Sequence, residues 1–216
     1  MPPDNSNFRY FNTPVNTPVP PWLGNFVLKA RSGTDLWRKP SRDTFTAPVL
    51  YTSAPIHFFR AEVTVHIRLT TAFEWDQGGL VIFAGPPPVT TSATAAAPMP
   101  NQPPAGKWVK AGIEYYNGRT TASSVSASSD GADWSLVELP LGVNELKVRF
   151  ERVDHALWVW FDDGAEWKKL REVTWFFYGV DEKNVRVGVY ASRPANFMSG
   201  RSLEELVVEF EGLEIY

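Results

Sequence analysis

Apolar and polar residues alternate with a period of two along much of this chain. In the segment 60–69, for example, Val63 and Val65 alternate with Thr64 and His66. The same pattern recurs in the segments 108–118, 155–164, 184–192 and 206–216. Successive side chains of a β-strand point to opposite faces, so this alternation predicts strands that each bury one face.

Two further signals complete the prediction of the fold class. The segment 79–85 (GLVIFAG) is almost entirely apolar, which predicts a central strand covered on both faces. The dipeptides Asp130-Gly131 and Asp163-Gly164 predict tight turns between strands. Helical periodicity is scarce along the chain. We therefore predict an all-β protein, a two-sheet antiparallel sandwich of the jelly-roll type.

Proline content indicates how the chain is organised. Residues 1–21 are rich in Pro and Asn and lack periodicity, so we expect an N-terminal arm. Residues 22–216 are expected to form one sandwich domain. Within it, the Pro- and Ala-rich segment 85–106 predicts a long hairpin loop, which is either decoration or a lid over the adjacent sheet face.

The composition excludes several classes of function. Cysteine is absent from the 216 residues, which excludes thiol catalysis, zinc–thiolate sites and iron–sulfur clusters. The formal net charge of -3 at pH 7 lacks the basic bias of a nucleic-acid groove. No apolar run is long enough for a membrane span, and the first residues lack the pattern of a secretory signal, so we expect a soluble cytoplasmic protein. His57, His66 and His155 show no metal-ligand spacing, so neither a metal nor another cofactor is expected.

Several motifs, in a fixed order along the chain, are similar to one known family. They are LWRKPSRDTFTAP (36–48), EWDQGGLVIF (74–83), WVKAGIEYYNG (108–118), DWS (133–135), LREVTWFF (170–177) and VGVYASRP (187–194). Together they resemble the regulation-of-enolase family, a domain of unknown function. The resemblance implies a concanavalin-A-like lectin/glucanase sandwich in which one of the two sheets is concave. It also implies a link to enolase and galactose metabolism, and a relation to domains that are appended to some glycosidases.

The segment 108–118 carries the most specific candidate ligand site. Its core-facing positions are expected to be Val109, Ala111, Ile113 and Tyr115. The opposite, concave face is then expected to present Trp108, Lys110, Glu114 and Tyr116. A sugar offers hydroxyl groups to Lys and Glu and apolar C–H faces to aromatic rings, and Gly112 is expected to let a ligand approach the backbone. The alternative is an exposed Lys110–Glu114 ion pair without a ligand.

Other candidate ligand contacts come from three further segments. Gly188 and Tyr190 repeat the small-plus-aromatic pattern on another strand. The remaining candidates are Trp75, Asp76 and Gln77, which precede a Gly-Gly pair, and the adjacent Arg42 and Asp43. The alternative interpretation is that Asp76 caps a turn and that Arg42 and Asp43 belong to a structural ion-pair network.

Catalytic residues are harder to assign. Glucanases of the resembled fold use an E-x-D-x-x-E arrangement, and here Glu74 and Asp76 are followed by Gly79 in the third position. This departure argues against a retaining hydrolase, which needs two carboxylates. Lys110, Glu114 and His66 remain as candidate acid–base groups.

The sequence thus predicts a lectin-like sandwich that binds a carbohydrate or similar polar metabolite on its concave face and regulates a metabolic enzyme such as enolase. Three alternatives stay open: a cofactor-free isomerase or cyclase that uses the same groove, a glycoside hydrolase, and a surface that binds only protein. Neither a nucleic acid nor a membrane is an expected partner.

Overall fold

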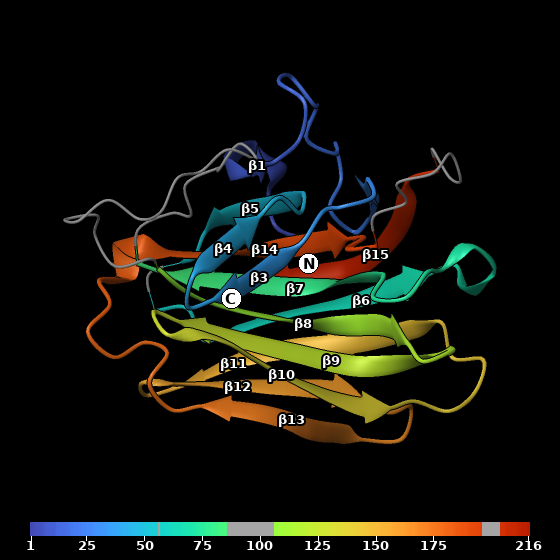
Figure 1. Cartoon of the computed structure of the whole chain (residues 1–216). Helices are drawn as coiled ribbons and strands as arrows, with labels where there is room; N and C mark the ends of the chain where they lie inside the picture. Colours follow the sequence, from blue (N-terminus) through green and yellow to red (C-terminus); the bar gives the residue numbers. More distant parts are fainter. Residues whose placement is uncertain (56, 86–105, 196–203) are drawn as a thin grey trace.

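The computed structural model describes residues 1–55, 57–85, 106–195 and 204–216, and Figure 1 shows its two stacked antiparallel sheets. The seven-stranded sheet has the spatial order β1 (Arg9–Phe11), β5 (Val49–Ser53), β14 (Val185–Ser192), β7 (Gln77–Ala84), β8 (Lys107–Tyr116), β9 (Arg119–Ser128) and β10 (Gly131–Glu138). The six-stranded sheet has the order β13 (Trp167–Val173), β12 (Ala156–Asp162), β11 (Glu145–Val153), β6 (Arg60–Ile67), β15 (Leu206–Ile215) and β2 (Asn25–Ala30).

The remaining elements are short. Strands β3 (Leu36–Lys39) and β4 (Arg42–Phe45) form a separate hairpin, and the 3₁₀ turns are η1 (Asn5–Asn7), η2 (Leu69–Thr71) and η3 (Glu182–Asn184). In the part of the chain that the structure describes, no helix has the length and apolar character that a membrane crossing requires. The predicted all-β antiparallel sandwich is confirmed, because each segment predicted from period-two alternation contains a strand.

The main core lies between the two sheets and follows the predicted alternation. On β8, Val109, Ala111 and Ile113 are buried in this core. They pack with apolar residues of the facing sheet, among them Val63, Val65, Val148, Phe150, Val159 and Phe210. The other β8 side chains therefore lie on the outer face of the seven-stranded sheet, the face turned away from the core.

A second apolar cluster covers part of that outer face. The β3–β4 hairpin lies across the seven-stranded sheet (Figure 1) and packs Leu36 and Phe45 against it. Their partners include Val49, Val81, Phe83, Trp108, Val125 and Tyr190. Every residue of β7 is buried, since one face of this strand meets the main core and the other meets the hairpin cluster. The prediction of a central strand covered on both faces is confirmed.

Glycines allow β7 and β8 to approach closely at the centre of the sheet. Gly79 and Gly112 are cross-strand partners. A Cβ atom on Gly112 would lie 1.9 Å from the carbonyl oxygen of Gly78, far inside van der Waals contact. The absence of a side chain at Gly112 thus allows the backbone of β7 to pack beside it. The sequence analysis expected a ligand to approach the backbone at this position, but β7 occupies the space.

The two proline-rich segments have different positions relative to the described structure. From the arm 1–21, Phe8 enters the main core, and Arg9–Phe11 pairs with β5 as an edge strand. Of the segment 85–106, only Gly85 and Gly106 belong to the described residues, so the lid or decoration predicted there lies outside them.

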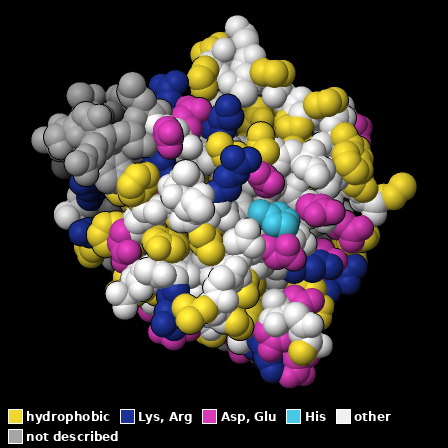
Figure 2. All heavy atoms as spheres, turned by 90° about the vertical axis from the view of Figure 1, so that its right-hand side faces the viewer, with side chains coloured by type: hydrophobic (Ala, Val, Ile, Leu, Met, Phe, Trp, Pro, Cys, Tyr) yellow, Lys and Arg dark blue, Asp and Glu magenta, His cyan; other side chains and the backbone are white. Residues whose placement is uncertain are grey.

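On the face of the molecule that Figure 2 shows, acidic and basic side chains are interspersed, in keeping with the small net charge.

Candidate functional site

A pocket of about 470 Å³ opens on the outer face of the seven-stranded sheet, beside the hairpin. Its floor consists of β7, β8 and β9, and its sides consist of the hairpin, the turn before β7 and strand β10. The lining residues are Gly33, Asp35, Trp37, Lys39, Arg42, Thr44, Trp75, Gln77, Lys110, Glu114, Val125, Trp134 and Pro194. The site thus combines three tryptophans with cations, carboxylates and an amide.

The hairpin acts as a wall because its two faces differ. Leu36 and Phe45, which are cross-strand partners, face the second apolar cluster. The intervening positions face the pocket, and they form the cross-strand pairs Trp37–Thr44 and Lys39–Arg42. Period-two alternation in two short strands therefore gives one apolar face that anchors the hairpin and one polar and aromatic face that lines the pocket.

Buried Arg38 fixes the tip of this wall. Its guanidinium donates to the carbonyl oxygens of Gly106 and Ser128, at 3.0 and 2.9 Å, and to the carboxylate of Asp43 at 2.7 Å. These bonds connect the hairpin to the start of β8 and the end of β9. The Asp43 carboxylate is therefore paired with Arg38, on the face of the hairpin that is turned away from the pocket.

Lys110 is the central cation of the pocket floor. Its Nζ lies 3.5 Å from Asp35 Oδ1 and 5.4 Å from the centroid of the Tyr190 ring. The Lys110 side chain is only 2% exposed, so carboxylate and ring both compensate for its desolvation. Asp35 is held in place as well, because its Oδ1 accepts the backbone N–H of Leu36 at 2.7 Å.

Glu114 is the buried carboxyl of the floor, and its surroundings alter its acidity. Trp134 Nε1 donates to Glu114 Oε2 at 3.1 Å. Burial raises the pKa of Glu114 above its usual value, and the negative charge of Asp35 acts in the same direction. Polar contacts with Ser123 and Trp134 and the charge of Lys110 oppose the rise in this pKa without cancelling it. Because its pKa is raised, Glu114 is a stronger candidate for a proton donor than an exposed glutamate.

Gln77 and Trp75 are oriented by hydrogen bonds behind the pocket. The buried Tyr190 hydroxyl donates to Gln77 Oε1 at 3.2 Å, and Gln77 Nε2 donates to the Trp75 carbonyl oxygen at 3.2 Å. Burial raises the pKa of Tyr190 well above its usual value, so its hydroxyl keeps the proton that it donates. Trp75 itself has a positive φ of 68° and a side chain that is 44% exposed, so its ring is available at the pocket.

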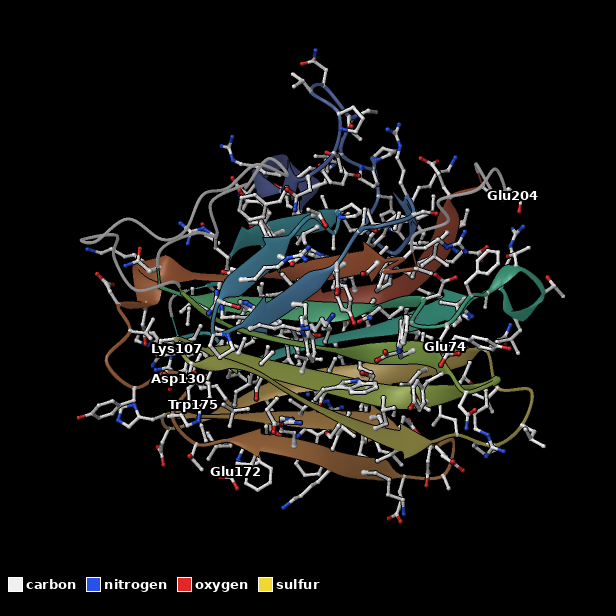
Figure 3. All side chains as sticks on the ribbon, viewed as in Figure 1. Glu74, Lys107, Asp130, Glu172, Trp175 and Glu204 are labelled. Carbon is white, nitrogen blue, oxygen red and sulfur yellow. The ribbon has the colours of Figure 1, made fainter. Side chains whose placement is uncertain are left out.

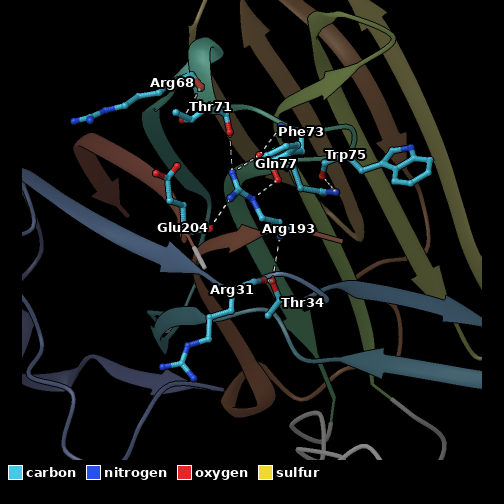
Figure 4. A network of polar contacts seen from close by, with 10 residues as sticks. Arg31, Thr34, Arg68, Thr71, Phe73, Trp75, Gln77, Arg193 and Glu204 are labelled. Atoms are coloured by element: carbon cyan, nitrogen blue, oxygen red, sulfur yellow. Dashed lines mark hydrogen bonds and ion pairs between the residues drawn. The ribbon is translucent and has the colours of Figure 1, made fainter. Parts of the chain in front are cut away.

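A buried ion pair supports the turn that carries Trp75 (Figure 4). Arg193 donates through Nε to Asp76 Oδ1 at 2.9 Å and through Nη2 to Asp76 Oδ2 at 2.7 Å. The same guanidinium donates to the carbonyl oxygens of Thr71 and Glu204. The Asp76 carboxylate also accepts the Phe73 N–H at 2.9 Å. Burial raises the pKa of Asp76, and Arg193 opposes that rise.

Five of the residues predicted from the sequence meet in the pocket. They are Trp75, Gln77, Lys110, Glu114 and Arg42. These residues come from four separate parts of the fold, namely β4, the turn before β7, β7 itself and β8. No ligand contact tests their roles, so these remain predictions.

The structure places the other predicted residues outside the pocket lining. Trp108 is 1% exposed within the second apolar cluster, so it packs beneath the hairpin rather than facing a ligand. Tyr190 lies below the floor. Asp76 and Asp43 are engaged by Arg193 and Arg38, and the ring of Tyr116 packs edge-on against Trp134.

His66, a candidate general base, lies on the other sheet. It belongs to β6 and is close to Glu145 and Glu211, with nitrogen–oxygen distances of 3.4 and 3.9 Å. It therefore does not share a site with Lys110 and Glu114, which lie on the opposite sheet of the sandwich.

The two carboxylates compared with the glucanase motif also lie outside the lining. Asp76 forms the buried ion pair, and Glu74 accepts the Asn117 N–H through both of its oxygens. Figure 3 shows Glu74 at the end of the sheet opposite Lys107. Among the described residues, no cluster of three or more His, Asp or Glu side chains is arranged to hold a metal ion.

The sequence analysis missed pocket residues that become visible only after folding. Asp35, Trp37, Lys39 and Trp134 line the pocket but had no assigned role in binding. Trp134 is 38% exposed and donates a hydrogen bond to Glu114. The β9–β10 register places Trp134 opposite Val125, which also lines the pocket. The sequence alone does not give this register.

Solved structures of similar fold come from several sources. A functionally unknown protein from Saccharomyces cerevisiae is 19% identical, with a TM-score of 0.69 over 99% of this chain and 98% of that chain. LamAcat from Zobellia galactanivorans is 11% identical, with a TM-score of 0.51 over 100% of this chain and 92% of that chain. The GH43 protein BlXynB from Bacillus licheniformis is 13% identical, with a TM-score of 0.59 over 88% of this chain, and the match spans only 32% of that protein. At these identities the likeness shows the fold alone, a two-sheet β-sandwich.

Sequence comparison identifies relatives more directly. The uncharacterized protein AN7484 of Emericella nidulans is 34% identical over 192 residues, which are 88% of this chain and 85% of that protein. The model of one protein family matches residues 11–216. The chain therefore belongs to the family described as "Protein of unknown function (DUF1349)".

Proposed function

We propose that this protein binds a carbohydrate in the pocket beside the β3–β4 hairpin. The observation that carries the proposal is that Trp37, Trp75 and Trp134 line one pocket whose floor presents Lys110 and Glu114. Sugars need this combination, because their C–H faces pack on aromatic rings while their hydroxyl groups exchange hydrogen bonds with charged and amide side chains.

The pocket is organised before any ligand arrives. Gln77 is oriented by Tyr190, Glu114 by Trp134, and Lys110 lies between Asp35 and the Tyr190 ring. A ligand would therefore meet polar groups whose rotamers are already restricted, which lowers the entropic cost of binding. The likeness of the fold to carbohydrate-active proteins is consistent with this proposal but does not supply its ligand.

Intrinsic tryptophan fluorescence tests the proposal, since the lining tryptophans would respond to a bound sugar. We expect saturable changes on titration with members of a panel of mono- and oligosaccharides. Trp75→Ala and Trp134→Ala should each weaken binding about tenfold through lost ring contact. Trp22→Ala, at an exposed tryptophan outside the pocket, is the matched control and should leave affinity unchanged. A panel that yields no saturable binding would refute the proposal.

The raised pKa of Glu114 favours a second candidate function, acid–base catalysis on the bound molecule. In that case Glu114 donates a proton and Lys110 stabilises developing negative charge, as in a cofactor-free isomerase or cyclase or a hydrolase of saccharides. Conversion of a bound ligand by the wild type, abolished in Glu114→Gln while binding persists, would establish this function. Binding without any conversion would leave the protein a lectin-like module.

Regulation of a metabolic enzyme such as enolase is a separate proposal, and it rests on the family resemblance alone. Pull-down with purified enolase in the presence and absence of a bound sugar tests it. Absence of binding under both conditions would remove this proposal and leave the carbohydrate site unaffected.

A further inference from the structure

The charges that line the pocket do not balance. The lining contains the cations Lys39, Arg42 and Lys110 and the carboxyl groups of Asp35 and Glu114. Lys110 and Asp35 compensate one another at 3.5 Å. Glu114 lies deeper, is 2% exposed and accepts the indole N–H of Trp134. Neither carboxyl group forms an ion pair with Lys39 or Arg42, the two cations of the hairpin wall.

Lys39 and Arg42 have no compensating group elsewhere in the described structure. Neither side chain forms an ion pair or a hydrogen bond to any residue within the described ranges, and both are exposed. Asp43, the acid adjacent to Arg42, lies on the opposite face of the hairpin, where Arg38 binds it. The hairpin thus directs its own carboxylate away from the pocket and its free cations toward it.

The two cations are also direct neighbours. Lys39 and Arg42 are cross-strand partners at the end of the hairpin, and both line the pocket. Like charges directly opposite each other on one face of an antiparallel pair destabilise the pairing. An anion bound between them removes this repulsion and gains charge-assisted hydrogen bonds to both groups.

We propose that the ligand is an acidic saccharide, a sugar whose carboxylate or phosphate group is held by Lys39 and Arg42. This inference rests on the proposed carbohydrate site and specifies its substrate class. The sugar ring packs on the tryptophans and contacts the Lys110–Glu114 floor, while the anionic substituent points along the wall toward the hairpin tip. Guanidinium and ammonium groups both bind carboxylate and phosphate oxygens, so the two substituents are distinguished by experiment.

Matched sugars test the inference. Affinities are measured by titration calorimetry for glucose, glucuronate and glucose 6-phosphate, and for galactose and galacturonate, at low and at raised ionic strength. We expect an acidic sugar to bind about tenfold more tightly than its neutral counterpart, the difference that one charge-assisted hydrogen bond provides. Raised salt should reduce this preference. The better of the carboxylate and phosphate probes identifies the substituent.

Substitutions at Lys39 and Arg42 test whether the hairpin causes the preference for acidic over neutral sugars. Lys39→Gln with Arg42→Gln should abolish the preference for acidic sugars, so that the acidic and the neutral sugar bind the double variant with equal affinity. Lys183→Gln, an exposed cation on η3 outside the pocket lining, is the matched control and should preserve the preference. Equal affinity of the wild type for neutral and acidic sugars, or a preference that survives the double substitution, overturns this inference but leaves the carbohydrate site intact. Failure of every sugar to bind overturns both.

Discussion

Trp134 donates a hydrogen bond from its indole nitrogen to the buried carboxylate of Glu114 at 3.1 Å, across the intervening strand β9. The bond joins an exposed pocket tryptophan on β10 to the acidic group of the floor on β8. The position of the Trp134 ring in the pocket therefore affects the pKa of Glu114, because the bond favours the charged carboxylate.

The first prediction concerns this bond. Trp134→Phe keeps an aromatic ring but removes the donor. Because the hydrogen bond stabilises the charged carboxylate, its loss should raise the pKa of Glu114 further above its usual value. The pKa is measured by following the side-chain carboxyl carbon of Glu114 by NMR as the pH is changed. Trp75→Phe, which makes no bond to Glu114, is the control, and an unchanged or lowered pKa in Trp134→Phe would contradict the prediction.

Glu114 should also contribute to the pH dependence of stability. A carboxyl group whose pKa is raised on folding binds its proton more tightly in the folded state, so folding stability falls as pH rises from 4.5, the ordinary value, through the raised pKa. Glu114→Gln lacks this titration. The free energy of unfolding of the wild type, relative to the variant, should therefore decrease with rising pH across this window and level off above it. Urea denaturation at several pH values measures the difference, and a relative stability that increases with pH would disprove the raised pKa.

The Asp76–Arg193 ion pair should be essential for folding stability. Both side chains are at most 1% exposed, so Asp76→Ala leaves a buried guanidinium without its counter-charge. We expect a loss of about 3–5 kcal/mol in the free energy of unfolding, the usual consequence of breaking a buried pair. Glu209→Gln removes a partner from the exposed Arg68–Glu209 pair and should change stability by less than about 1 kcal/mol. Chemical denaturation of both variants makes the comparison, and similar losses would show that burial of the pair is unimportant.

Gly112→Ala tests the close approach of β7 and β8. The added methyl group would meet the Gly78 carbonyl oxygen at 1.9 Å, and that neighbour is backbone that cannot move aside without separating the strands. We expect a loss of roughly 3 kcal/mol or more, at the upper end of the range for overpacked cores. Thermal and urea denaturation measure it. If Gly112→Ala retained wild-type stability and lost only ligand affinity, the glycine would instead serve ligand approach, as the sequence analysis expected.

Much of the fold was predictable because strand formation has a local signal. Alternation in the segments 60–69 and 108–118 predicted which side chains face the core, and Val63, Val65, Val109 and Ile113 are buried there. The apolar segment 79–85 likewise predicted a strand covered on both faces. These inferences need only the two-residue period of a strand and the free energy gained by burying apolar surface.

The composition of the pocket was predictable only in part. Lys110, Glu114 and Gln77 reach it because alternation on β7 and β8 places them on the outer face. Alternation placed Trp108 on that same face. The β3–β4 hairpin covers this end of the sheet, however, so the Trp108 side chain is buried in the second apolar cluster. His66 alternated as regularly as Lys110, yet its strand belongs to the other sheet.

By itself, the sequence determined the strands, their buried faces and the sandwich class, because each depends on neighbours one or two residues away along the chain. The tertiary structure decided which part of the outer face is covered and which is open, and it brought Asp35, Trp37 and Trp134 to the same pocket as Glu114. These contacts join segments far apart in sequence. Their existence depends on strand order and on where the β3–β4 hairpin packs, and a period of two carries no information about either.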